Sequence, residues 1–173
     1  MRKKRIIKDY EILRGLHKKG VISGVKSFSN KKKSMEHLAV SFKGPKNTPY
    51  AGGKYKLEIK YGPNYPMRPP FVRLHTPIWH PNFWPNPKEY LGKRNICLAL
   101  VDNELVGKPN GWSPSKNIGT VIYSILAMFN IEGAFVNPKD VFNKDAAIEF
   151  LNKKKNFVKK AKNVNKKYAK SYW

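Results

Sequence analysis

The residue best suited to carry out a chemical reaction is Cys97, the single cysteine among 173 residues. A thiol is a strong nucleophile even when only a few per cent of it is ionised near neutral pH. Lys93 and Arg94 lie a few positions upstream, and nearby positive charge favours the thiolate, so we expect them to lower the pKa of Cys97. The alternative, a small inert residue of the core, is less favoured because the surrounding stretch is rich in prolines and charges.

Few other residue patterns suggest chemistry. A lone cysteine excludes an internal disulfide and a multi-cysteine zinc site. The four histidines lack the paired spacing of metal ligands; they are His17, His37, His75 and His80. The glycine-containing stretch GPKNTPYAGGK lacks the arrangement of a phosphate-binding loop. We therefore expect neither a metal ion nor a cofactor.

Composition predicts one folded domain over residues 1–173. Hydrophobic residues make up 40% and aromatic residues 13%, which is too apolar for a disordered chain. No run approaches the roughly 18 apolar residues of a membrane span, and the basic N-terminal segment lacks the apolar core of a secretory signal. A cytoplasmic location is expected, extending to the nucleus in a eukaryotic cell.

The charge balance is strongly positive, with 35 Lys and Arg against 11 Asp and Glu, a net charge of +24. Such a surface attracts acidic partners, which include nucleic acid, an anionic membrane surface or an acidic protein face. The alternative is a solubilising surface in a chain rich in Lys and Asn.

Hydrophobic periodicity predicts the elements that must position Cys97. Helices are expected at 2–19, 116–129 and 145–171, and strands at 21–28, 37–42, 54–61 and 71–76. The stripe of the first helix is Ile6, Tyr10, Leu13, Leu16 and His17, and that of the last helix is Ala147, Phe150, Leu151, Phe157, Val158, Ala161, Val164 and Tyr168. Four consecutive strands joined by short turns favour an antiparallel meander. Residues 77–115 are mostly loop, and a loop this long is usually functional.

Five motifs in this order resemble the ubiquitin-conjugating enzymes over nearly the whole chain. They are the block GPKNTPYAGG with its following strand, the loop YPMRPP, the tripeptide HPN, the segment NICLAL with WSPS after it, and VNPKDVFNKDAA. The resemblance implies an α/β (α+β) fold, in which a four-stranded antiparallel meander is flanked by an N-terminal helix and C-terminal helices. It also implies transfer of ubiquitin or a related modifier from an activating enzyme, through a cysteine thioester, to a substrate lysine.

The resemblance assigns roles to individual residues. Cys97 matches the acceptor of the modifier. Asn82 carries a donor amide that could stabilise the oxyanion formed when an amine attacks the thioester, or it braces its own loop. His80 is expected to fix the turn rather than act as the base of a Cys-His hydrolase, whose other signatures are missing. Asp140 matches the acidic position that would orient the incoming lysine, with a helix or turn aspartate as the alternative.

Partner surfaces follow from the same matching. Lys4, Arg5 and Lys8 match the basic face that meets the activating enzyme. Loop tips that would dock a ligase are Met67, Pro114 and Ser115. The family often carries Phe where Met67 stands, a position linked to HECT-type ligases, so Met favours a RING-type ligase, with packing within the loop as the alternative. The family default is a monomer that does not bind membranes.

Two features depart from the family. Asn82, Cys97 and Trp112 are spaced at intervals of 15 residues, which places insertions at about 83–94 and 101–111, on either side of the thiol. Ala99 stands where the family often has Asp, which disfavours transfer to lysine without a ligase. The pathway could be archaeal, viral or divergent eukaryotic.

Two other readings remain open. One is a non-catalytic interaction module with the same fold, although such variants lack the cysteine. The other is a basic nucleic-acid-binding protein, or a weak secondary affinity of this kind, through the lysine-rich face of the last helix.

Overall fold

The computed structural model describes residues 1–29, 34–86, 93–131 and 141–171. Its centre is one antiparallel sheet whose strands follow each other in chain order. The strands are β1 (Gly24–Ser27), β2 (His37–Lys43), β3 (Lys54–Lys60) and β4 (Phe71–Leu74). The predicted meander is therefore confirmed, with each strand within a few residues of its predicted bounds.

Strict alternation of apolar and polar residues gives β3, one of the two inner strands, a single buried face. Leu57 and Ile59 are at most 1% exposed, whereas the intervening residues face outward. On either side, Val40 of β2 pairs with Leu57, and Val72 of β4 pairs with Ile59. These pairs place one apolar surface on the inner face of the sheet, where it meets the helices.

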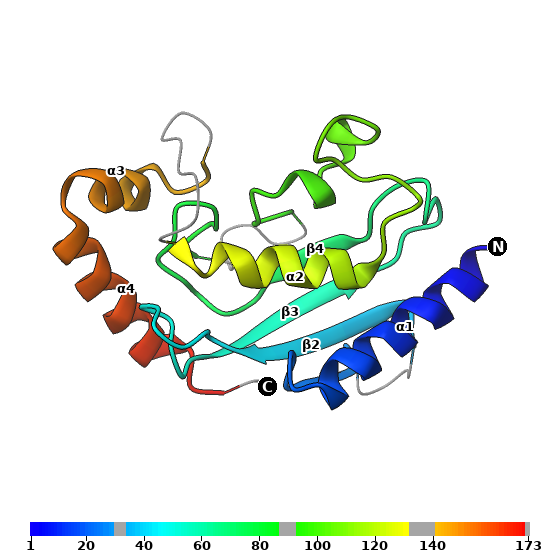
Figure 1. Ribbon diagram of the computed structural model, residues 1–173, viewed down its shortest axis with the longest axis horizontal. Helices are drawn as coiled ribbons and strands as arrows, with labels where there is room; N and C mark the ends of the chain where they lie inside the picture. Colours follow the sequence, from blue (N-terminus) through cyan, green and yellow to red (C-terminus); the bar gives the residue numbers. More distant parts are fainter. Residues whose placement is uncertain (30–33, 87–92, 132–140, 172–173) are drawn as a thin grey trace.

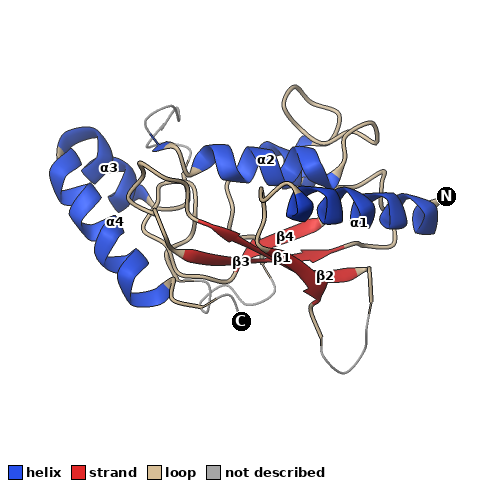
Figure 2. Cartoon of the chain, turned by 60° about the horizontal axis from the view of Figure 1, so that its bottom comes forward, coloured by secondary structure: helices blue, strands red, loops and turns tan. Residues whose placement is uncertain are grey.

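Two helices cover that inner face, as Figure 2 shows. They are α1 (Arg2–Lys18) and α2 (Ile118–Met128). In the predicted stripe of α1, Ile6, Leu13 and Leu16 are buried, Tyr10 is half-buried and His17 is exposed. Asp9 is fully buried on this face, which helical periodicity of apolar residues could not reveal. The helix thus carries a carboxylate into the interior, and this carboxylate has polar partners described below.

The predicted single helix over 145–171 is wrong, because the chain forms two helices at one end of the molecule (Figure 1). They are α3 (Lys144–Asn152) and α4 (Lys154–Tyr168), separated by Lys153 with φ −140° and ψ 54°, outside the helical region. The polar run 152–156 contains no apolar residue to continue the stripe, and the bend lets the ring of Phe150 pack against Phe157 at 5.3 Å. Consequently Leu151, predicted to lie in the stripe, is 51% exposed.

The stretch between β4 and α2 is largely loop, as predicted. Its described part contains two short 3₁₀ helices, η2 (Ala99–Val101) and η3 (Asn103–Leu105), directly after Cys97. Among the described helices, none is long and apolar enough to cross a lipid bilayer.

Candidate active site

The turn at residues 80–82 is fixed by a buried histidine. His80 is 0% exposed, and its Nε2–H donates to the carbonyl oxygen of Met128 at 2.8 Å. Its Nδ1 accepts the backbone N–H of Asn82 at 3.0 Å. Burial lowers the pKa of His80 to about 4, so the ring is neutral at physiological pH. With both nitrogens occupied, the ring braces the turn and is poorly suited to act as a base.

A short antiparallel pairing places Cys97 beside this turn. The backbone N–H of Cys97 donates to the carbonyl oxygen of Asn82 at 2.8 Å, and Phe83 forms an isolated bridge with Ile96. Phe83 and Ile96 are both 0% exposed, so the pairing is anchored in the core. Cys97 itself is half-buried. The thiol is therefore held at a fixed place at the edge of the packed interior and is not sealed inside it.

Asn95 ties the same segment to the sheet. Its side-chain amide donates to the carbonyl oxygen of Leu74 at 2.6 Å, and its Oδ1 accepts the N–H of Leu74 at 2.9 Å. Its own carbonyl oxygen accepts the N–H of Trp84 at 3.0 Å. Because Leu74 ends β4, these bonds fix the position of the cysteine segment relative to the sheet. Motif matching gave no role to Asn95, because its burial and its bonds to Leu74, 21 residues away, are visible only in the structure.

The two cations upstream of the thiol lie in different surroundings. Lys93 is exposed, whereas Arg94 pairs with Asp102 at 2.8 Å and lies over the ring of Phe142 at 5.4 Å. The charge of Arg94 is thus balanced by a carboxylate five residues beyond Cys97. The predicted lowering of the pKa of Cys97 by these two cations stays a prediction.

The segment that would carry the lysine-orienting carboxylate, Asp140, lies outside the described residues. The chain is described again from residue 141, and Asn143 connects it to the site. Its N–H donates to the carbonyl oxygen of Pro81 at 2.9 Å, and its side chain caps α3 by accepting the N–H of Ala146 at 3.1 Å. The start of α3 is therefore tied to the turn beside Cys97.

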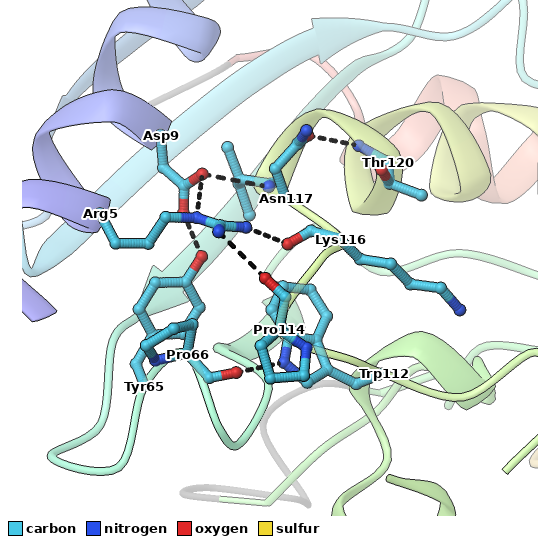
Figure 3. Close-up of polar contacts among 10 residues, drawn as sticks. Arg5, Asp9, Tyr65, Pro66, Trp112, Pro114, Lys116, Asn117 and Thr120 are labelled. Carbon is cyan, nitrogen blue, oxygen red and sulfur yellow. Dashed lines mark hydrogen bonds and ion pairs between the residues drawn. The ribbon is translucent and has the colours of Figure 1, made fainter. Parts of the chain in front are cut away.

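The predicted ligase-docking tips are exposed and are held by one buried ring. Met67 is 66% exposed, and Pro114 and Ser115 are also exposed. Between them Trp112 is 0% exposed and donates its indole N–H to the carbonyl oxygen of Pro66 at 2.7 Å. This bond joins the two loops that carry the tips, as Figure 3 shows.

Arg5 lies differently from its predicted place on an exposed basic face. Its guanidinium donates to the carbonyl oxygen of Pro114 at 3.0 Å and to that of Lys116, and its side chain is only 22% exposed. Figure 3 shows this guanidinium between α1 and the loop after Trp112. The exposed members of the predicted set are Lys4 and Lys8. Arg5 thus fixes the loop to the helix, and this contact could not be foreseen from helical spacing alone.

Asp9 completes this contact from inside. The Tyr65 hydroxyl donates to one carboxylate oxygen of Asp9, and the other oxygen lies 3.7 Å from Nε of Arg5 and 3.5 Å from the N–H of Ile118. Burial raises the pKa of Asp9 despite these partners. The buried carboxylate therefore links α1, the start of α2 and the loop between β3 and β4 that carries Met67.

The spacing of the histidines did not predict that His37 of β2 and His75, directly after β4, share one carboxylate. His37 and His75 each place Nε2 at 2.7 Å from a different oxygen of Glu58. Burial alone would raise the pKa of Glu58, but these two hydrogen bonds outweigh it and hold the pKa at about 2. Within the described residues, no group of three or more His, Cys, Asp and Glu side chains is arranged to hold a metal ion.

Comparison with known proteins gives one consistent family. The family model "Ubiquitin-conjugating enzyme" matches residues 5–165. Ubiquitin-conjugating enzyme E2 13 of Schizosaccharomyces pombe is 31% identical over 166 residues, which cover 96% of this chain and 97% of the relative. Human ubiquitin-conjugating enzyme E2 T is 36% identical over 138 residues, which cover 80% of this chain and 62% of the relative.

A solved structure agrees with these matches. The E2 domain of a Toxoplasma gondii ubiquitin conjugating enzyme superposes with a TM-score of 0.74 at 26% identity, covering 98% of this chain and all of that one. The fold, the order of the motifs and the extent of the matches point the same way: this chain belongs to the ubiquitin-conjugating enzyme family and is a transferase of the E2 class.

Proposed function

We propose that Cys97 carries ubiquitin or a ubiquitin-like modifier as a thioester. The Cys97 sulfur attacks the thioester carbonyl at the modifier's C-terminus, a new S–C bond forms, and the activating enzyme's sulfur leaves and takes up the proton. ATP is consumed in the upstream activating step. A substrate lysine amine then attacks the same carbonyl, an amide bond forms, and Cys97 leaves as a thiol.

The observation that carries this proposal is the pairing of Cys97 with Asn82 at the edge of the core. The N–H···O bond of 2.8 Å fixes the two backbones side by side. From this position we propose that the Asn82 side-chain amide stabilises an oxyanion on a carbonyl bound to the sulfur. Asp140 is proposed to orient the attacking lysine, as its position in the motif suggests.

Side chains exposed on the surface are proposed to bind the activating enzyme and the ligase. Lys4 and Lys8 present positive charge to the activating enzyme, and Met67, Pro114 and Ser115 present two exposed tips to a ligase. We propose a RING-type ligase because Met stands in place of the family's frequent Phe. The proposed acting form is a cytoplasmic monomer that requires its ligase.

The test is a loading assay with activating enzyme, ATP and ubiquitin, run in parallel with related modifiers. An adduct that disappears with a thiol reductant and is missing in Cys97→Ala supports the proposal. If no modifier forms an adduct with the wild-type chain while a control E2 is loaded, the chain is a non-catalytic interaction module with this fold. Adding a RING-type or a HECT-type ligase to the loaded enzyme then tests the second proposal.

A further inference from the structure

The last helix carries an unusual distribution of charge. The fifteen residues of α4, all of them described, include seven lysines and no Asp or Glu. Phe157 and Ala161 are 0% exposed and anchor the helix to the rest of the molecule. The apolar face of α4 is therefore already used in the fold, and its charged face is turned to solvent.

Four of these lysines form a straight line, which we call the lysine row: Lys155, Lys159, Lys162 and Lys166. At 3.6 residues per turn they fall within an arc of about 60°, roughly opposite to Phe157 and Ala161. The row spans about 16 Å along the helix axis. All four side chains are exposed.

The lysines beside the row differ from it because they have partners inside the fold. They lie over aromatic rings: Lys154 over Phe150 at 5.6 Å, Lys160 over Trp79 at 3.4 Å and Lys167 over Tyr168 at 5.0 Å. Over the described ranges, no member of the lysine row takes part in an ion pair or a ring contact. Like charges three or four residues apart on a helix repel each other, so the lysine row does not stabilise the fold.

We propose that the lysine row binds the phosphate backbone of nucleic acid. Four exposed cations in a row, with only the half-buried Val158 beside three of them, suit repeated phosphates contacted without regard to sequence. Protein interfaces instead need apolar or aromatic anchors and are depleted in Lys. A bilayer surface would need a broad exposed apolar face to insert. In α4, Phe157 and Ala161 are buried, Val158 and Val164 are half-buried, and only Tyr168 at the end is exposed. Nucleic acid is therefore the polyanion that fits best.

The place of α4 keeps this binding compatible with the transfer reaction. α4 lies at the opposite end of the molecule from the first turn of α1, where Lys4 is exposed (Figures 1 and 2). Bound nucleic acid would leave α1 open to other partners. The inference does not depend on the role of Cys97, so either proposal can fail without the other.

The test measures binding of the whole chain to a 20-base-pair duplex by fluorescence anisotropy between 50 and 200 mM KCl. Four phosphate contacts contribute about −3.6 to the slope of log affinity against log salt, which is about 150-fold over this range. Changing all four row lysines to Gln should remove this part of the slope and most of the affinity at low salt. Changing them to Arg should keep both.

The matched control removes the same charge elsewhere, by substituting Gln at four other exposed lysines: Lys19, Lys43, Lys46 and Lys60. The control should keep a slope within about 1 of wild type. Equal losses in the two Gln variants would overturn the proposal, because net charge alone would then explain binding. Tighter, row-dependent binding of polyglutamate or of phosphatidylserine vesicles than of the duplex would overturn it too. Unchanged melting temperatures and far-ultraviolet circular dichroism spectra show that the variants are folded.

Discussion

The buried ring of His80 makes the stability of the fold sensitive to mild acid. In the folded chain its pKa is about 4, against 6.5 for an unperturbed histidine. As pH falls from 6.5 toward 4, the unfolded chain therefore binds a proton that the folded chain does not. Stability from this ring is fully present above pH 6.5 and is lost as pH falls through this window.

The size of the loss follows from the same two values. Each pH unit in the window costs about 1.4 kcal/mol, so the 1.5 units between pH 6.5 and pH 5 cost about 2 kcal/mol. At pH 4 the loss reaches about 3 kcal/mol. Other groups titrate here as well, among them Asp9, whose raised pKa has the opposite effect. A comparison with a variant that cannot titrate at position 80 cancels them.

Urea unfolding of wild type and His80→Gln at pH 7 and pH 5 supplies that comparison. Wild type should lose about 2 kcal/mol more than the variant between the two pH values, although the variant starts from a lower stability because a buried hydrogen bond is changed. Equal pH dependence in the two proteins, or a His80 pKa near 6.5 by NMR, would refute the reasoning.

Two further predictions concern contacts that position the loops. Arg5→Ala should lower the free energy of unfolding by about 2 kcal/mol, because both hydrogen bonds to loop 114–116 are lost. Lys4→Ala, at an exposed position, should change it by less than about 0.5 kcal/mol. Equal effects of the two substitutions in urea unfolding would contradict the role of Arg5 in fixing the loop. Asn143→Ala should cost about 1 kcal/mol through loss of the cap of α3, and Asn152→Ala at the other end should cost less; the reverse order would show that the cap is unimportant.

Local patterns were enough for much of the fold. The alternation in β3 and the spacing of Ile6, Leu13 and Leu16 each reflect one buried face, so the elements could be placed from sequence. The break at Lys153 could not, because lysine is a good helix former and the bend depends on Phe150 packing against Phe157. Tertiary contacts override local preference at this point.

The site was predictable where it depends on motifs and unpredictable where it depends on contacts distant in sequence. The order of motifs placed Cys97 near Asn82, and the structure pairs their backbones. The inward Asp9 and the shielded Arg5 have partners more than 50 residues away, which no spacing rule can identify. The same holds for the bond from Asn143 to the turn beside the thiol.

The most direct measurement for the central claim is the intact mass of Cys97→Ser after incubation with activating enzyme, ATP and the modifier. A serine hydroxyl in the acceptor position should trap the modifier as an oxyester, adding one modifier mass that survives a thiol reductant. The wild-type adduct should have the same mass and be lost under that treatment. A wild-type adduct that survives the reductant, or equal loading of wild type and Cys97→Ala, would contradict the assignment of Cys97 as the acceptor.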